Sequence, residues 1–358
     1  MTDIRIGIIG TGQMAATMAR AIALTPGVRI LGVESNSGNA GRAHAFAQTC
    51  GGVRAFDTSA ALLANNQIDL VYIASSTASH PTLTIAALDA GKAVLCEKPF
   101  ATSLAEAQKI TDAARRSGCF CMEALWTPFL PADVHVAELV RARAAGEPVH
   151  LSASFGYPVT SASHPALFEP NGGGVLLDRA IYPLSLALRL LGPVAAVDGR
   201  VKRDARGVDV HASIQLAHRS GAHSQLTVSL VSLLANSAII SGSQGSITLG
   251  APLIGAEAVT VHHTEPPQTA RADVNARSNA GMVADKLRAL PALRRLKRMW
   301  PSGTRHHGPY GANPYQPLLQ HMFAMLRAKQ TESSEVPLAH SLEIMRIIEA
   351  VRRQGSPG

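Results

Sequence analysis

The sequence predicts an α/β protein in which a doubly wound parallel sheet is followed by an α+β part with a large open, mostly antiparallel sheet. From Ile4 to Leu125, short apolar runs alternate with helical patterns, an order typical of a parallel sheet. From Val194 to Leu249, short alternating runs are separated by glycine, serine or charged turns, which indicates antiparallel strands. We therefore expect two domains, 1–124 and 125–358, with the C-terminal helices able to pack back on the first.

The first strand runs into a glycine-rich turn. Ile4–Ile9 is followed by Gly-Thr-Gly-Gln-Met-Ala and then by an alanine-rich helical pattern, Ala16–Leu24. Gly10 allows a tight turn, and Gly12 lets a pyrophosphate approach the backbone at the helix N-terminus. This order predicts a Rossmann dinucleotide site; the alternative is a purely structural glycine turn. The cofactor contacts that it predicts are Gly10, Gly12, Gln13, Met14 and Ala15.

The end of the second strand, Val28–Val33, bears on the choice of cofactor. An acid there would bind the ribose hydroxyls of NAD, whereas a small residue followed by arginine suits the 2′-phosphate of NADP. The sequence has Glu34, Ser35 and Asn36, with Arg42 on the next helix. We expect Ser35 and Asn36 to contact the cofactor. That cofactor can be NADP or NAD, and the lack of an acid at position 35 favours NADP.

Capping residues mark the other elements of the first half. Thr58 or Asp57, and Thr102 or Ser103, are expected helix N-caps, and Glu106 is placed for a capping box. The predicted helices are Asn39–Cys50, Thr58–Ala64, Ser79–Ala90 and Thr102–Gly118, and the predicted strands are Val53–Phe56, Asp69–Ala74, the start of Ala93–Pro99, and Cys119–Leu125.

The stretch Ala93–Pro99 is the predicted centre of the site. Its apolar run is typical of a buried strand, and it ends in Glu97, Lys98 and a helix-starting proline. Ligands of open α/β sheets bind beyond the carboxyl ends of the strands, so Lys98 is expected to face a cleft. The alternative is a solvated lysine at a helix start.

After Trp126 the pattern changes. We expect one helix over Phe129–Ala145, a strand over Val149–Phe155, and a long apolar helix, Val175–Leu191, that Gly172–Gly174 opens. One face of the antiparallel sheet is expected to be apolar and available for a partner. The other predicted elements are strands at Val197–Val201, Val208–Leu216, His223–Val231, Ser237–Ser241 and Ser246–Leu249, and helices at Pro314–Ala328 and Leu338–Arg353.

Three residues can carry a reaction. Asp178 and Tyr182 lie four residues apart on the predicted helix and so share a face. A tyrosine phenol beside the Lys98 ammonium makes a general acid/base pair, because the cation favours the phenolate and the phenol relays a proton to a carbonyl or carbinol oxygen. In the alternative readings, Tyr182 is a satisfied core residue and Asp178 only caps the helix or pairs with Arg179.

Composition limits the class of protein. The 358 residues are 46% hydrophobic and 16% charged, which indicates a folded globular chain, and no apolar run approaches the length of a membrane span. The four cysteines show no C-x-x-C pairing, so no metal site is expected. A strand begins almost at once and leaves no room for a signal peptide, so a cytoplasmic location is expected.

The net charge of +8 is concentrated in one segment. Between Arg271 and His307, nine lysines and arginines face two aspartates, a net of +7. A solvated excursion over the sheet is one interpretation, and a lid or partner contact that favours an anionic substrate is another. Because almost all the excess lies in this segment, nucleic-acid binding is the weaker hypothesis.

Several stretches together resemble the Gfo/Idh/MocA oxidoreductases, most closely their dimeric dihydrodiol dehydrogenase and sugar dehydrogenase branch. They are G-T-G-Q-M-A, G-K-A-V-L-C-E-K-P-F, E-A-L-W, G-G-G-V-L-L-D-x-x-x-Y and S-L-E-I-M-R-I-I-E-A-V-R-R-Q. The resemblance covers most of the chain but not Arg271–Gly311. It implies that Lys98 is the active-site lysine, that Asp178 binds substrate and that Tyr182 is the proton donor. The further cofactor contacts that it implies are Glu97 and Lys98 on the nicotinamide side and Ser75, Thr77 and His80 after the fourth strand.

The chain departs from the family pattern at a few positions. Pro128 stands where the family's E-A-x-W-x-R-F has arginine, and Asp-Arg-Ala-Ile-Tyr replaces D-I-G-x-Y. We expect Arg179 to crowd or recharge the pocket. Ser75 and Ser76 replace the usual threonine and proline, and Asn36 replaces the usual NADP arginine. The catalytic set is therefore intact and the specificity set is altered.

The resulting hypothesis is an NAD(P)-dependent oxidoreductase that moves a hydride between the nicotinamide and a secondary alcohol or carbonyl of a sugar, polyol or cyclic trans-diol. Trp126, Phe155 and His164 are candidate substrate contacts; the alternatives are core packing for the aromatic residues and a surface loop for His164. The other function class is a non-catalytic cofactor-sensing or regulatory protein on the same fold. We expect a homodimer through the open sheet.

Overall fold

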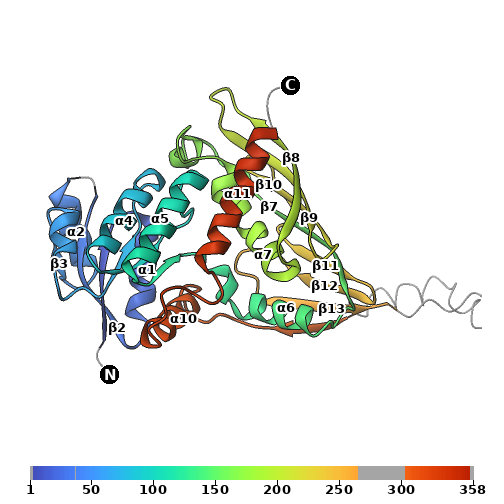
Figure 1. The fold of residues 1–358 in the computed structure, drawn as a ribbon, viewed down its shortest axis with the longest axis horizontal. Coiled ribbons are helices and arrows are strands. Elements are labelled where there is room, and N and C mark those ends of the chain that lie inside the picture. The colour runs from blue at the N-terminus through green and yellow to red at the C-terminus, as the bar shows by residue number, and fades with distance from the viewer. Residues whose placement is uncertain (1–2, 37, 265–302, 355–358) are drawn as a thin grey trace, which may run out of the picture.

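Two sheets face each other across a layer of helices (Figure 1). The computed structural model describes residues 3–36, 38–264 and 303–354. In the view of Figure 1 the first sheet lies on the left, in blue, and the second sheet forms the wall on the right. The middle layer contains helices from the second half of the chain, so the two halves share an extended contact.

The first sheet contains the strands β1 (Ile4–Ile9), β2 (Val28–Glu34), β3 (Arg54–Ala55), β4 (Leu70–Ile73), β5 (Ala93–Cys96) and β6 (Cys121–Glu123). All pairings are parallel, and the order is β3-β2-β1-β4-β5-β6. The direction of winding reverses between β1 and β4, where the carboxyl ends of such sheets form a ligand crevice. The predicted doubly wound parallel sheet is therefore confirmed.

The helices of the first half are α1 (Gln13–Ala23), α2 (Ala40–Thr49), α3 (Ser59–Leu63), η1 (Thr77–Ser79), α4 (His80–Asp89) and α5 (Leu104–Ser117). Asn39, Thr58 and Ser103 each accept a hydrogen bond from the backbone N–H three residues further on. Glu106 Oε2 accepts from the backbone N–H of Thr102 at 3.1 Å. The caps of α3 and α5 are thus Thr58 and Ser103, and the sequence had left both choices open.

The second sheet contains β7 (Pro148–Gly156), β8 (Val194–Arg203), β9 (Asp209–His218), β10 (His223–Ser229), β11 (Ala238–Gly242), β12 (Gly245–Leu249), β13 (Ala258–His263) and β14 (Thr304–His307). Its order is β14-β13-β12-β11-β7-β10-β9-β8. Every pairing is antiparallel except that of β7 with β10. The predicted large, mostly antiparallel sheet is confirmed, and β13 and β14 are strands that the sequence analysis did not predict.

The helix predicted over Phe129–Ala145 is shorter and begins differently. A 3-10 turn, η2 (Thr127–Phe129), is followed by α6 (Pro131–Arg141). Leu130, between them, is extended with ψ 141°. A residue before proline is disfavoured in the α conformation, so Pro131 separates the two elements.

The glycine-led helix predicted over Val175–Leu191 is also interrupted. The five residues after Val175 form a π-helical turn, η4 (Leu176–Ala180), and α7 (Ile181–Leu191) follows. Pro183 has no backbone N–H and cannot make the α-helical hydrogen bond one turn back, which accounts for the wider turn before it. The short helix η3 (Pro165–Phe168) lies in the connection between β7 and η4.

Helices cover one face of the second sheet. α7 packs against β7 and β10, α11 (Leu338–Gln354) against β8, and α6 against β12 and β13. Along β7, β9 and β10, the uncovered positions are mostly serine, threonine, glutamine and histidine. The expectation of an apolar face free for a partner is therefore wrong, because the helices bury that face. A dimer through the other face stays a prediction.

The C-terminal helices lie against the first half of the chain. α10 (Gln316–Arg327) contacts α1, and α11 lies between α5 and β8 (Figure 1). The backbone N–H of Leu104 donates to Glu349 Oε1 at 2.8 Å, which fastens the start of α5 to α11. The domain limits at 124 and 125 stay predictions.

Most of the basic segment Arg271–His307 lies outside the described residues, which resume at Gly303. The lid and solvated-excursion interpretations therefore stay predictions. Within the ranges that the structure describes, none of the helices is long and apolar enough to cross a membrane.

Candidate functional site

Lys98 lies where the first sheet meets the second half of the chain. It follows Glu97 directly after β5. Lys98 Nζ donates to Asp178 Oδ1 at 2.7 Å and to the main-chain oxygen of Asp178 at 3.3 Å. The two side chains are 16% and 24% exposed, so the ion pair is largely shielded from water. Two of the three predicted catalytic residues are thus in direct contact, although they are far apart in the sequence.

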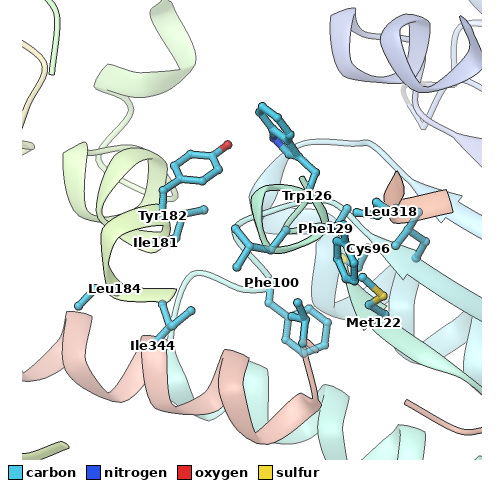
Figure 2. Close-up of a cluster of buried hydrophobic side chains, with 14 of the residues drawn as sticks. Cys96, Phe100, Met122, Trp126, Phe129, Ile181, Tyr182, Leu184, Leu318 and Ile344 are labelled. Carbon is cyan, nitrogen blue, oxygen red and sulfur yellow. The ribbon is translucent and has the colours of Figure 1, made fainter. Parts of the chain in front are cut away.

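Tyr182 joins this pair through the face of its ring. Lys98 Nζ lies 5.4 Å from the ring centroid. The Phe155 ring meets Tyr182 edge-on, with centroids 5.7 Å apart and planes at 90°. Figure 2 shows the Tyr182 hydroxyl directed toward the Trp126 side chain. The direct partner of Lys98 is therefore Asp178, and Tyr182 is its aromatic neighbour.

Burial and charge set the protonation states of the three groups. Burial lowers the pKa of Lys98, but the charge and hydrogen bond of Asp178, together with Tyr182 and Glu97, outweigh it, so this pKa is raised above its ordinary value. Burial raises the pKa of Asp178, but the charge and hydrogen bond of Lys98, together with Arg179 and His164, outweigh that effect and hold the pKa below its usual range. Burial raises the pKa of Tyr182, and Lys98 offsets only part of the rise. At neutral pH the site holds an ammonium, a carboxylate and a neutral phenol.

The turn between β1 and α1 has the form that a dinucleotide needs. Gly10 has φ 112°, and a Cβ there would lie 2.3 Å from the Ala74 carbonyl oxygen. A Cβ on Gly12 would meet no described atom within 4 Å, and α1 begins without a side-chain cap from the described residues. The buried Thr11 hydroxyl has no hydrogen-bond partner in the described part of the chain. The open helix N-terminus fits a pyrophosphate group. The first turn of α1 holds the predicted contacts Gln13, Met14 and Ala15, of which Ala15 is buried.

Glu34 is turned into the protein at the end of β2. Its Oε1 accepts from the Asn36 backbone N–H and its Oε2 from the Ser59 hydroxyl, each at 2.7 Å. Asn36 has φ 51°, and its amide donates to Ser79 Oγ at 3.1 Å. Ser35 is buried beside them. The carboxylate that could bind ribose hydroxyls is therefore occupied by internal hydrogen bonds.

His80 ties together the two loops after β4 and β5. Its Nδ1 lies 2.9 Å from the Pro99 carbonyl oxygen, and its Nε2 lies 3.3 Å from that of Ser75. Burial lowers the pKa of His80, so the ring is neutral and donates to one carbonyl at a time. Thr77 begins η1 between these loops. The predicted cofactor residues Ser75, Thr77 and His80 therefore lie together after β4, and His80 connects them to the segment after β5.

Glu97 is a buried neighbour of Lys98. Its Oε1 accepts from the Tyr72 hydroxyl at 2.5 Å and its Oε2 from the Lys98 backbone N–H at 3.1 Å. Burial raises the pKa of Glu97, and these hydrogen bonds oppose the rise. Glu97 therefore supports the Lys98 backbone from inside the sheet.

The predicted substrate residues lie at different depths. Trp126 and Phe155 are buried and flank Tyr182. The Trp126 ring also packs on Tyr315, with centroids 5.1 Å apart. His164 is exposed in the loop before η3, and its electrostatic interaction with Asp178 favours the carboxylate. The two aromatic residues thus pack around Tyr182, whereas His164 lies in an exposed loop.

Comparisons with known proteins agree with this arrangement. Residues 4–125 match the NAD-binding Rossmann fold of the Gfo/Idh/MocA oxidoreductases, and residues 134–248 match their C-terminal domain. Trans-1,2-dihydrobenzene-1,2-diol dehydrogenase from Mus musculus is 31% identical over 247 residues, which is 68% of this chain and 73% of that protein. The chain belongs to the Gfo/Idh/MocA family. It is therefore an NAD(P)-binding oxidoreductase.

Three further proteins extend the comparison. The dTDP-3,4-didehydro-2,6-dideoxy-alpha-D-glucose 3-reductase of Streptomyces violaceoruber is 36% identical over 250 residues, 69% of this chain and 72% of that one. An aldose-aldose oxidoreductase from Caulobacter crescentus shares the fold with a TM-score of 0.80 at 21% identity, over 99% of this chain and 97% of that chain. An Agrobacterium radiobacter oxidoreductase matches with a TM-score of 0.79 at 23% identity, over 100% and 97% of the two chains.

The family resemblance did not reveal how the Asp178 helix is held. Asp209, buried on β9, accepts from the Leu176 backbone N–H at 2.8 Å through Oδ1. Arg352 on α11 pairs with Oδ2 at 3.1 Å. Gly174 has φ 99°, and a Cβ there would lie 2.4 Å from Asp209 Oδ1. Asp209 thus serves as a cap from 33 residues away, for which the local sequence carries no signal.

Glu123 is a second residue that the sequence analysis did not single out. Its Oε1 accepts from the Phe100 backbone N–H at 2.9 Å, and its Oε2 accepts from the Ser341 hydroxyl at 2.6 Å. It therefore links the segment after Lys98 to α11. Burial raises the pKa of Glu123 to about 7. It lies within the family-like stretch E-A-L-W, which was the available signal.

Of the two effects expected of Arg179, crowding of the pocket is not seen, whereas its charge does act on the site by helping to lower the pKa of Asp178. It is fully buried, and its Nη1 donates to the main-chain oxygens of Tyr157 and Ser229. Its Nε lies 3.7 Å from Asp178 Oδ2. The side chain is directed toward the ends of β7 and β10, because two carbonyl acceptors lie there.

Proposed function

We propose that this Gfo/Idh/MocA protein interconverts a secondary alcohol and a carbonyl on a sugar, polyol or cyclic trans-diol. The observation that carries the proposal is the shielded Lys98–Asp178 pair against the Tyr182 ring, beyond the carboxyl ends of the first sheet. Relatives named above act on a cyclic trans-diol and on a dideoxy sugar nucleotide. The Caulobacter structure holds glycerol and the Agrobacterium structure holds tartrate, both polyhydroxylated molecules.

In the proposed reaction, the bound nicotinamide supplies or accepts the hydride. Lys98 and Tyr182 both carry their protons at neutral pH, so both can donate to the oxygen of a carbonyl that is being reduced. Asp178 keeps Lys98 charged and offers its exposed edge to a neighbouring substrate hydroxyl.

A second comparison supports the roles of Lys98 and Tyr182. Solved structures of a 3-ketoreductase from Actinomadura kijaniata include variants of one lysine and one tyrosine that are 84 positions apart in that chain. Lys98 and Tyr182 are also 84 positions apart. We infer that the same pair was altered there.

NADP is the proposed cofactor. Glu34 is held by Asn36 and Ser59, so it is not available to the ribose of NAD. In this proposal Ser35 and Asn36 contact the adenosine ribose, and the exposed Arg42 lies on the adjoining helix. A neutral rim with a nearby cation suits a 2′-phosphate.

Substitution of Lys98 and Tyr182 tests the proposed reaction. Lys98→Met and Tyr182→Phe should each lower kcat by roughly 10²–10⁴-fold on a panel of ketosugars and cyclic diketones, while NADPH fluorescence still reports binding. Lys109→Met, an exposed lysine on α5, is the matched control and should keep full activity. Normal turnover in either site variant would refute the catalytic assignment. Cofactor binding by the wild-type protein without turnover of any compound would favour the sensor hypothesis.

A further inference from the structure

Arg179 is the largest side chain that is completely buried in the described chain. Its Nη1 bonds two main-chain oxygens, of Tyr157 at 2.7 Å and of Ser229. Ser229 pairs with Gly156, so the guanidinium joins the carboxyl ends of the parallel strands β7 and β10. Its Nε and Nη2 are buried and have no hydrogen-bond partner among the described residues. Burying a guanidinium whose N–H groups lack hydrogen-bond acceptors costs folding free energy. We therefore asked which neighbouring groups Arg179 holds in place.

The neighbour that Arg179 fixes most closely is an exposed aromatic ring. The guanidinium carbon lies 3.9 Å from the Tyr157 ring centroid and 5.6 Å from that of Phe155. Tyr157 is nevertheless 42% exposed. Arg179 thus holds Tyr157 through both its main chain and one ring face, while part of the ring stays in solvent. A ring fixed in this way loses little freedom when a ligand stacks on it.

Two more apolar side chains are exposed beside Tyr157. Val231 and Leu233, in the segment after β10, are 48% and 74% exposed. The Val159 N–H donates to Leu230 O at 2.8 Å, and the Leu234 N–H donates to Gly156 O at 3.0 Å, so this segment is fastened to the one after β7. We call Tyr157, Val231 and Leu233 the apolar rim.

The apolar rim is continuous with the reaction site. The Tyr182 and Phe155 centroids are 5.7 Å apart, and those of Phe155 and Tyr157 are 5.9 Å apart. This aromatic series leads from Lys98 outward to solvent. Residues 157–163 and 230–237 contain no charged side chain, so the segments that form the rim bring no charge of their own to the surface on which a ligand would rest.

We propose that the apolar rim is a second substrate subsite, which stacks on a neutral aromatic ring carried by the substrate beyond its reacting carbinol. The proposal rests on the proposed function for the position of that carbinol. Tyr157 is its specificity-determining residue, and Arg179 positions Tyr157. A flat ring suits an exposed aromatic face, whereas a phosphate would find no cation exposed among the rim residues.

A matched pair of glycosides tests the subsite without turnover. Binding of p-nitrophenyl and methyl β-D-glucopyranoside to the NADP-loaded full chain is measured by calorimetry, since the two differ only in the ring. The nitrophenyl compound should bind at least about tenfold more tightly. Tyr157→Ala should reduce the preference to below about threefold, and Tyr157→Phe should retain it. Val149→Ala, at an exposed apolar position at the other end of β7, should leave it unchanged.

Several outcomes would overturn the subsite. The proposal is wrong if the two glycosides bind with equal affinity or if neither binds. It is also wrong if Tyr157→Ala keeps the full preference for the nitrophenyl compound. A change of oligomeric state in Tyr157→Ala with unchanged glycoside preference would make the rim a protein interface instead. Because calorimetry needs no reaction, the subsite would stand on ring-dependent binding even if no compound of the ketosugar and diketone panel were turned over, a result that would refute only the proposed function.

Discussion

Two glycine-rich turns open helices at this site, and they are built in different ways. The turn at Gly10–Ala15 is fixed locally, by the strand before it, the helix after it and the Ala74 carbonyl of the next strand. The turn at Gly172–Gly174 is fixed by distant residues: Asp209 on β9 caps it, and Arg352 on α11 pairs with that cap. The cofactor side therefore depends on backbone sterics, and the substrate side depends on long-range polar contacts.

The largest expected effect is on the local turn. In Gly10→Ala a Cβ would lie 2.3 Å from the Ala74 oxygen at a φ that disfavours side chains. We expect a loss of about 3 kcal/mol of unfolding free energy, measured by urea denaturation, together with loss of NADPH binding. Gly38→Ala, which shares a positive φ but meets no described atom within 4 Å, is the control and should lose less. Equal losses would show that steric contact with Ala74 is not the cause.

The second prediction concerns Glu123, which links the segment after Lys98 to α11. Its pKa is raised to about 7, so the folded state keeps a proton that the unfolded chain releases near pH 4.5. The resulting stabilisation is present below pH 4.5 and is lost as the pH rises to about 7. Glu123→Gln stays neutral, so its unfolding free energy relative to wild type should rise by on the order of 3 kcal/mol between pH 4.5 and pH 8. A flat difference between Glu123→Gln and wild type over this pH range would contradict the prediction.

The distant turn should affect chemistry more than cofactor binding. In Gly174→Ala the new methyl group would displace the Asp209 carboxylate and shift the helix that carries Asp178. We expect kcat to fall about 30-fold, or about 2 kcal/mol in the barrier, with the NADPH Kd within twofold of wild type. Asp209→Asn keeps an oxygen for the Leu176 N–H and should restore most of the rate relative to Asp209→Ala. A parallel loss of NADPH binding would show that the two turns are not independent.

The smallest effect is expected at Gly12. A Cβ there meets no described atom within 4 Å, so Gly12→Ala should leave the thermal midpoint unchanged. It should weaken NADPH binding about tenfold, or about 1.4 kcal/mol, because the methyl group occupies the approach to the helix N-terminus. Fluorescence titration checks this, and unchanged affinity would remove Gly12 from the cofactor contacts.

The sequence predicts the locally fixed turn at Gly10 better than the turn at Gly172–Gly174, which distant residues fix. The strand, turn and helix around Gly10 are adjacent in the chain, so their pattern predicts the structure directly. The sequence predicts Lys98, Asp178 and Tyr182 as catalytic residues and pairs Lys98 with the Tyr182 phenol. It does not show that the direct partner of Lys98 is Asp178. Pro183 is a local signal for the interruption of this helix, because it lacks a backbone N–H. The roles of Asp209 and Arg352 had none, because pairing between distant residues leaves no periodic pattern.

The turn at Gly172–Gly174 depends on residues that are made much later, which has a consequence during translation. Arg352 lies 143 residues after Asp209, so a ribosome that makes roughly 5–20 residues per second needs on the order of ten seconds between them. The β1 turn, by contrast, has its contacting strand β4 soon after it emerges. The nascent chain can therefore form the dinucleotide crevice well before the helix with Asp178 and Tyr182 is anchored, and reactivity is the last property that the growing protein acquires.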